Sequence, residues 1–134
     1  MKKLVALFLA SLMALSLAAP ALAVNEDVTG TIMIYTSIYQ DVLDAMVEAL
    51  AEEFPNLTVD TFYGGTGNIQ TKLSAEMDAG NIQVDLLLVA EPAYSLELKE
   101  LGYLHAYKTP AAENLRFPYD EEGYWYPVRV CNMI

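Results

Sequence analysis

The sequence predicts an α/β fold with a mostly parallel sheet flanked by helices. Short β-rich runs alternate with segments of helical period in the order β-α-β-α-β-α, and the connections between them are short. The apolar run 86–90 is continuous, which is typical of a strand covered on both faces of its sheet. Parallel strands joined through helices normally make right-handed crossovers, so the helices should cover the sheet.

The first half of this pattern contains two strands and the helix between them. A β-rich run covers 31–35, and a helix is expected after Ser37, where apolar residues recur at spacings of three and four with acidic residues on the opposite face. Pro55 and Asn56 end this helix, and a second strand is expected over 57–63.

The second half repeats the pattern after the glycine-rich turn 64–67. A helix is expected over about 68–79, with Gly80 suited to ending it in a left-handed conformation. A third strand is expected over 84–90. A third helix is expected over about 92–101. The proline at its start is tolerated, because an N–H in the first turn of a helix has no partner within the helix.

Beyond residue 104 the alternation of helix and strand stops. Residues 107–118 are predicted to be irregular and 119–123 to form a turn, while 124–130 is another strand candidate. Tyr124 belongs to an aromatic group that could stack on a ligand or pack between sheet and loops. Arg129 needs a partner, which could be an internal acid or a carboxylate or phosphate of a ligand.

The first 23 residues differ in composition from the 111 that follow. Lys2 and Lys3 precede the apolar run 4–19, and Ala23 ends an A-x-A tripeptide, so 1–23 is predicted to be a secretory signal peptide cleaved after Ala23. A membrane anchor is the alternative, but it would need roughly 20 apolar residues and no cleavage site. Because no cysteine adjoins the cleavage site for lipid attachment, the product is expected in the periplasm.

Without the signal peptide, five basic and eighteen acidic residues give a net charge of −13. Binding to nucleic acid or to an anionic membrane surface normally needs a basic face, so both classes of partner are excluded. Cys131 is the only cysteine and cannot form an intrachain disulfide.

Ligands of open parallel sheets bind outside the carboxyl ends of the strands, and polar residues follow each of the three predicted strands. Hydroxyls and backbone N–H groups at a helix N-terminus favour an anion, and a glutamate could face a cation. The hydroxyls could instead cap helices, the glycines could serve a tight turn, and the glutamate could be a solvated acid. The candidates are Thr36, Ser37, Gly65, Thr66, Gly67 and Glu91.

Several other motifs are absent or incomplete. A P-loop needs a glycine directly before its lysine, but Thr71 precedes Lys72. A dinucleotide-binding fingerprint needs a third glycine, but Gln70 stands at that position. His105 is the only histidine and has no clustered ligands, so neither a catalytic nor a metal role is expected. Lys72 and Lys99 are expected to face solvent.

Taken together, the motifs resemble the extracellular solute-binding proteins of ABC importers over essentially all of the chain after the signal peptide. The branch most similar is the one that binds ferric iron, phosphonates and polyamines. The resemblance rests on the order and spacing of Ile34-Tyr35-Thr36-Ser37, Tyr63-Gly64-Gly65-Thr66-Gly67, Val84-Asp85-Leu86-Leu87-Leu88, Ala90-Glu91-Pro92-Ala93-Tyr94, Leu101-Gly102-Tyr103-Leu104 and Gly123-Tyr124-Trp125-Tyr126-Pro127-Val128-Arg129.

The resemblance implies a periplasmic-binding-protein-like (type II) fold of two lobes that close over a ligand. Residues 24–127 would form the first lobe and 128–134 the start of a hinge-crossing strand, with the second lobe missing. The full-length protein would be a monomer that captures a small solute and delivers it to an ABC permease in the inner membrane, without catalysis or a cofactor.

The resemblance carries over to some site residues. Glu91 matches a glutamate ligand of the ferric-binding members, so Fe³⁺ would be a transported ligand and Glu91 its metal ligand. The histidine of those members is replaced here by Tyr39 or a neighbour. Ser37, Thr66 and Gly67 match positions where relatives hold a carboxylate, a phosphate or a synergistic anion.

Two other functions remain open from the residues alone. One is an exported α/β enzyme whose catalytic residues lie in the missing C-terminal part. The other is an acidic adhesive or structural domain.

Overall fold

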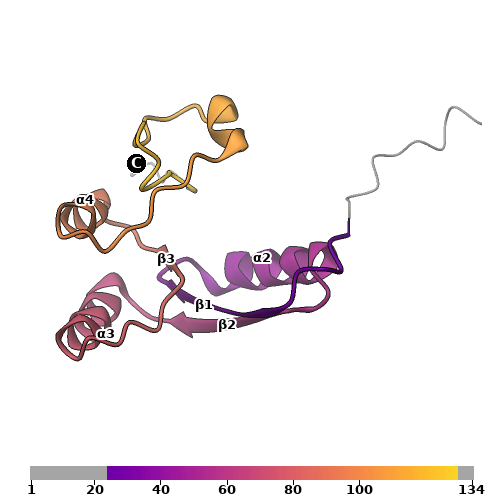
Figure 1. Ribbon diagram of the computed structural model, residues 1–134, viewed down its shortest axis with the longest axis horizontal. Coiled ribbons are helices and arrows are strands. Elements are labelled where there is room, and N and C mark those ends of the chain that lie inside the picture. Colours follow the sequence, from indigo (N-terminus) through magenta and orange to yellow (C-terminus); the bar gives the residue numbers. More distant parts are fainter. Residues whose placement is uncertain (1–23, 130–134) are drawn as a thin grey trace, which may run out of the picture. The chain divides into compact units, whose positions relative to one another are not determined.

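A computed structural model describes residues 24–129 (Figure 1). The predicted signal peptide over 1–23 and positions 130–134 of the predicted hinge strand lie outside the described residues. Within these limits the chain divides after Leu88 into two compact units. The first unit covers 24–88 and the second covers 89–129.

The first unit is built on a parallel sheet of strands β1 (Gly30–Thr36), β2 (Leu57–Tyr63) and β3 (Leu86–Leu88). The strand order is β2-β1-β3, so β1 is central. The register pairs Thr36 of β1 with Tyr63 of β2 on one side and with Leu88 of β3 on the other. The predicted α/β class, with a parallel sheet and flanking helices, is confirmed.

Helices α2 (Gln40–Glu53) and α3 (Thr66–Asp78) cover opposite faces of this sheet (Figure 1). Val59 and Thr61 of β2 line a groove with α2, whereas Phe62, which points the other way, lies beneath Lys72 of α3. The chain steps from β1 out to β2 and then back past β1 to β3. Right-handed crossovers in opposite directions place the two helices on opposite faces.

The core of the first unit centres on the last residues of β1. Packing against them are apolar side chains from α2 and α3, each worth about 1.5–3 kcal/mol when fully buried. The buried residues of this unit are Ile34, Tyr35, Thr36, Leu43, Ile69 and Leu73.

The third strand is shorter and more exposed than the sequence predicts. It covers Leu86–Leu88 rather than 84–90, and Leu86 is 45% exposed. Before it, the Asp85 N–H donates to the Met33 carbonyl at 2.9 Å, and the Asp85 carboxylate accepts the Met33 N–H at 2.8 Å. A side chain therefore takes the place of a strand carbonyl. Burial on both faces of the sheet, as predicted, is therefore wrong for Leu86, and among the described strands β3 pairs with β1 alone.

The second unit contains α4 (Pro92–Glu100) and the 3₁₀ helix η1 (Pro110–Asn114). Pro92 occupies the first turn of α4, as predicted, and Tyr94 and Leu98 are buried. The predicted strand 124–130 is not formed over its described residues, 124–129. Pro127 has no N–H to donate, and this segment pairs with no strand within the part of the chain that the structure describes.

A network around Asp120 holds the loop of the second unit instead. The Asp120 carboxylate lies 2.7 Å from Lys99 Nζ and accepts the Tyr124 N–H at 2.9 Å. The hydrogen bond from Lys99 lowers the pKa of Asp120. Lys99 also lies 3.4 Å from Glu122 and over the Tyr124 ring, so the expectation that it faces solvent is wrong.

Gly123 closes this loop in a way that other residues cannot. Its φ is +91°, and a Cβ at this position would lie 2.9 Å from the Tyr107 carbonyl oxygen. Gly102, in the same unit, also has a positive φ, of +78°, but a Cβ there meets nothing within 4 Å.

Gly123→Ala should therefore destabilise the second unit more than Gly102→Ala. The control should cost about 1–2 kcal/mol for its backbone conformation, and Gly123→Ala about 1–3 kcal/mol more for the clash. Urea unfolding followed by the fluorescence of Trp125, the only tryptophan, measures both changes. Equal costs for the two variants would contradict the close approach to Tyr107.

Candidate functional site

The carboxyl ends of the three strands form one hydrogen-bonded edge. Thr36 and Tyr63 are register partners, and the Gly64 N–H donates to the Thr36 carbonyl at 3.0 Å. On the other side of β1, the Ser37 N–H donates to the Leu88 carbonyl at 3.0 Å. The loops that follow β1 and β2 therefore start side by side.

Two of the predicted hydroxyls meet at this edge. Thr66 Oγ1 lies 3.2 Å from Ser37 Oγ, and both residues are half-buried. Thr36, in contrast, is fully buried, and its hydroxyl accepts the Ile38 N–H at 3.0 Å. Ser37 and Thr66 can reach a ligand from solvent. Thr36 supports the loop and is not exposed to a ligand in this structure.

None of the three hydroxyls caps a helix. The N-cap of α2 is Tyr39 and that of α3 is Gly65, and neither helix has a side-chain cap hydrogen bond. The capping interpretation of Thr36, Ser37 and Thr66 is therefore wrong. An uncapped N-terminus keeps backbone N–H donors and a partial positive charge. Asp41 already occupies the first turn of α2, whereas the first turn of α3 contains no acid, so α3 is the better place for an anion.

The glycines at the start of α3 are required neither by backbone conformation nor by space. Gly65 has a φ of −61°, and Gly67 is not among the glycines with positive φ. A Cβ at either position would meet nothing within 4 Å. A tight turn therefore does not explain them. What they do provide is backbone without side chains, open to a ligand at the helix N-terminus.

A polar cluster lies behind this edge, on the face of the sheet that α3 covers. The Tyr35 hydroxyl donates to Glu76 Oε1 at 2.6 Å, and Lys72 Nζ lies 2.8 Å from the same oxygen. The Gln83 N–H donates to Glu76 Oε2 at 3.1 Å. Lys72 Nζ also lies 5.1 Å from the centroid of the Tyr35 ring and 5.3 Å from that of Phe62.

These contacts shift the pKa values of all three side chains. Burial and the bond to Glu76 raise the pKa of Tyr35, so its hydroxyl stays protonated and donates. The hydrogen bond to Glu76 raises the pKa of Lys72. Burial alone would raise the pKa of Glu76, but the bonds from Lys72, Tyr35 and Gln83 outweigh it and lower that pKa below 4.5.

This cluster was not predicted from the sequence, where Lys72 was expected only to face solvent; its side chain is 37% exposed but also pairs with Glu76. Lys72 and Glu76 stand at i and i+4 on a helix, a spacing that favours an ion pair. That signal can be read from the sequence. The approach of Tyr35, 41 positions away, cannot.

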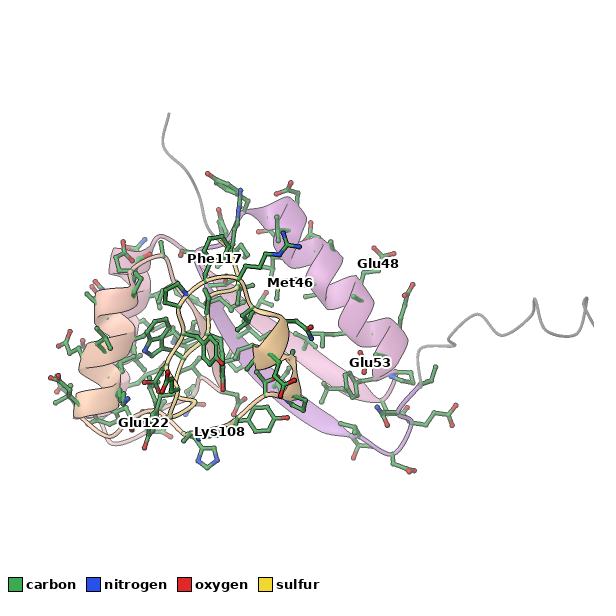
Figure 2. All side chains as sticks on the ribbon, turned by 90° about the horizontal axis from the view of Figure 1, so that it is seen from above. Met46, Glu48, Glu53, Lys108, Phe117 and Glu122 are labelled. Atoms are coloured by element: carbon green, nitrogen blue, oxygen red, sulfur yellow. The ribbon has the colours of Figure 1, made fainter. Side chains whose placement is uncertain are left out.

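The charge of the first unit is strongly unbalanced. Residues 24–88 carry eleven acidic side chains and one basic one, Lys72, which is engaged by Glu76. Five of the acids lie on α2, among them Glu48 and Glu53 (Figure 2). At physiological ionic strength exposed charges are screened beyond about 8 Å, so an anion at the N-terminus of α3 is governed mainly by its near donors.

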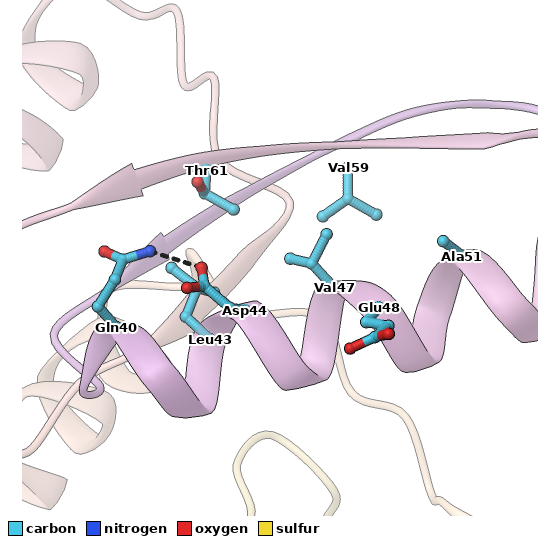
Figure 3. A pocket seen from close by; sticks show the side chains of 8 residues that line it. All are labelled: Gln40, Leu43, Asp44, Val47, Glu48, Ala51, Val59 and Thr61. Carbon is cyan, nitrogen blue, oxygen red and sulfur yellow. Dashed lines mark hydrogen bonds between the residues drawn. The ribbon is translucent and has the colours of Figure 1, made fainter.

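A groove of about 360 Å³ lies between α2 and β2 (Figure 3). Apolar side chains such as Val47 and Val59 face each other across it, and the Gln40 amide donates to Asp44 at 2.8 Å on its rim. None of the predicted site residues lines this groove. It is lined by Gln40, Leu43, Asp44, Val47, Glu48, Ala51, Val59 and Thr61.

The remaining candidates lie in the second unit. Glu91 is the exposed N-cap residue of α4 and makes no side-chain cap hydrogen bond. Tyr124 is half-buried beneath Lys99, and Arg129 is exposed and lies in no strand. Over residues 24–129, no three His, Cys, Asp or Glu side chains are grouped closely enough to hold a metal ion.

The sequence matches no protein-family model, and a search among curated proteins finds no match either. None of the helices formed by residues 24–129 is long and apolar enough to cross a membrane.

Glu76→Gln should destabilise the protein in a pH-dependent way. At neutral pH we expect a loss of about 1–3 kcal/mol, because hydrogen bonds to a charged group are weakened. A lowered pKa stabilises the fold above the unfolded pKa of 4.5, and this contribution is lost as pH falls through the folded pKa. The difference between wild type and variant should therefore shrink in acid.

Urea unfolding followed by circular dichroism, at neutral pH and at a series of acidic values, measures this difference. Glu48→Gln, on the exposed face of α2, is the control and should change the stability by less than about 0.5 kcal/mol. A Glu76→Gln deficit that stayed constant into acid would show that the charge of Glu76 does not stabilise the fold.

Proposed function

We propose that this chain forms the first lobe of a periplasmic solute-binding protein of an ABC importer, with a type II fold. The protein would capture a small anionic solute at the carboxyl edge of the sheet and deliver it to a permease in the inner membrane. It would do so as a monomer and without catalysing a reaction.

One observation carries the proposal: the N-terminus of α3 is open to a ligand. It has no side-chain cap and no acid in its first turn. Gly65 and Gly67 leave its backbone bare although neither glycine is needed for the turn. The Ser37 and Thr66 hydroxyls lie 3.2 Å apart beside it. Backbone N–H groups, a helix dipole and hydroxyl donors together suit the oxygens of a phosphate, a phosphonate or a carboxylate.

Other features are in keeping with this function. Residues 1–23 have the pattern of a secretory signal peptide, and no cysteine stands beside the predicted cleavage site. The order of its motifs resembles that of solute-binding proteins. In the strand order β2-β1-β3, the direction in which successive strands are added to the sheet reverses beside β1, and open α/β sheets bind ligands outside the carboxyl ends of the strands at such a point.

Among the solutes of the branch that the chain resembles, a phosphonate or organophosphate suits this edge best. A ferric ion accompanied by an anion would also use the N-terminus of α3, through the oxygens of that anion. A polyamine would not, because it has no anionic group to accept the N–H donors. The geometry therefore favours the oxyanion over the polyamine.

Capture would proceed by closure of two lobes around the solute. A ligand held by one lobe alone binds weakly, and contacts from the second lobe then favour the closed state. Ser37, Thr66 and Gly67 would supply the contacts of the first lobe.

The experiment is an NMR titration of the protein with phosphate, methylphosphonate and spermidine. Phosphate and methylphosphonate should shift the amides of Ser37, Gly65, Thr66 and Gly67 in a weak, saturable manner, and spermidine should not. Shifts confined to other residues, or none with either anion, would overturn the proposal. Tight one-to-one binding by this chain alone would contradict the two-lobe mechanism.

Gly67→Ala tests whether the bare backbone matters. Because Gly67 lies in α3 with open space around it, alanine should leave the stability unchanged or raise it by up to about 1 kcal/mol. The added methyl group crowds the ligand, so affinity for phosphate should fall about fivefold, or about 1 kcal/mol. Ser74→Ala, exposed farther along α3, is the matched control and should leave the affinity unchanged.

A further inference from the structure

We propose that Tyr35, Lys72 and Glu76 are positioning residues that hold the N-terminal turn of α3 against the end of β1. This inference rests on the proposed function, because that turn supplies the donors of the anion site. None of the three residues needs to touch the ligand.

Their places in the chain link the two halves of the site. Tyr35 is 1% exposed and directly precedes Thr36 and Ser37 at the end of β1. Lys72 and Glu76 lie on the turns of α3 that follow Thr66. A contact between Tyr35 and Glu76 therefore fixes the helix relative to the strand whose loop carries Ser37.

The carboxylate of Glu76 is held from three directions. Tyr35 donates to Oε1 from β1 at 2.6 Å, and Lys72 contacts the same oxygen at 2.8 Å from within α3. The Gln83 N–H donates to Oε2 at 3.1 Å from the segment that leads into β3. With 11% of its side chain exposed, Glu76 joins β1, α3 and the approach to β3 at one point.

The hydrogen bond from Tyr35 to Glu76 is shorter than the second hydrogen bond between side chains of α3 and the β1 segment. That second bond joins the Thr66 and Ser37 hydroxyls at 3.2 Å. A ligand that used these two hydroxyls would compete with their mutual bond. The tie through Glu76 would remain and keep the N-terminus of α3 in place while the ligand binds.

The arrangement also assigns a role to the only basic side chain of the first unit. Lys72 neutralises Glu76 and lies over the Tyr35 and Phe62 rings. Its charge therefore stabilises the contact between helix and strand and does not bind the ligand.

Tyr35→Phe tests the inference because it removes the hydroxyl and keeps the ring. Hydrogen exchange of single amides gives a readout that needs no ligand. The Gly64 N–H, bonded to Thr36, and the Ile69 N–H, bonded to Gly65, report on the N-terminus of α3. The Leu57 N–H, bonded to Phe54, reports on the far end of the sheet.

In Tyr35→Phe we expect exchange at Gly64 and Ile69 to rise several-fold more than exchange at Leu57. The affinity for phosphate should fall several-fold. Val47→Ala, a truncation on α2 away from α3, is the control for general loss of stability and should raise exchange at the three amides by a similar factor. Glu76→Gln, which keeps the shape of the side chain, replaces Tyr35→Phe if that variant does not fold.

If exchange in Tyr35→Phe rises by a similar factor at all three amides, the positioning role is overturned. It is also overturned if exchange rises only at Gly64 and Ile69 but the affinity for phosphate is unchanged. Failure of the unchanged protein to bind phosphate would overturn the proposed function instead. The exchange at Gly64 and Ile69 would still decide whether Tyr35 holds the turn.

Discussion

The first unit depends on the burial of the end of β1 between two helices and two strands. Ile34, Tyr35 and Thr36 are all but inaccessible to solvent, and each serves a different neighbour. Ile34 contributes to the hydrophobic core, the Tyr35 hydroxyl bonds Glu76 of α3, and Thr36 holds the loop before α2 through Ile38. A central strand with both edges paired can fix the positions of the loops that follow it and its neighbour. The polar edge at Ser37 and Thr66 is a consequence of that constraint.

The distribution of charge in the first unit also separates the supporting residues from the polar edge at Ser37 and Thr66. The acidic residues of the first unit lie mainly on α2 and at the amino ends of the strands, and the first turn of α3 contains none. The one cation of the unit is placed behind the sheet edge, where it neutralises a half-buried carboxylate. An oxyanion at this edge would therefore be bound by dipoles and hydrogen bonds rather than by a positive side chain. Such binding is compatible with a strongly acidic protein, because the attraction acts within the first turn of the helix.

Much of the fold follows from local patterns in the sequence. The strand 57–63 and the helix that ends before Pro55 were predicted from periodicity and turn residues, and the structure places them there. The third strand is shorter because the Asp85 side chain replaces a backbone acceptor, which is a contact across the sheet that periodicity cannot reveal. The segment 124–129 has β-rich composition but no strand beside it among the described residues, and a strand requires a partner.

The candidate site shows the same limit. Ser37, Thr66 and the glycines were predicted from their places after two strands, and the structure brings them to one edge. The proposed capping role fails because the Thr36 hydroxyl accepts the Ile38 N–H within its own loop and the N-cap residues of the two helices are Tyr39 and Gly65. Tyr35 was not predicted as part of the site because its partner lies on a helix 41 positions away.

The central claim is that the N-terminus of α3 is an oxyanion site. A crystal structure of the protein grown with tungstate, located by its anomalous scattering, tests this claim most directly. The account predicts tungstate against the N–H groups of Gly65–Gly67 and the hydroxyls of Ser37 and Thr66. Tungstate bound only elsewhere, for example at Lys108 or Arg116, would contradict it.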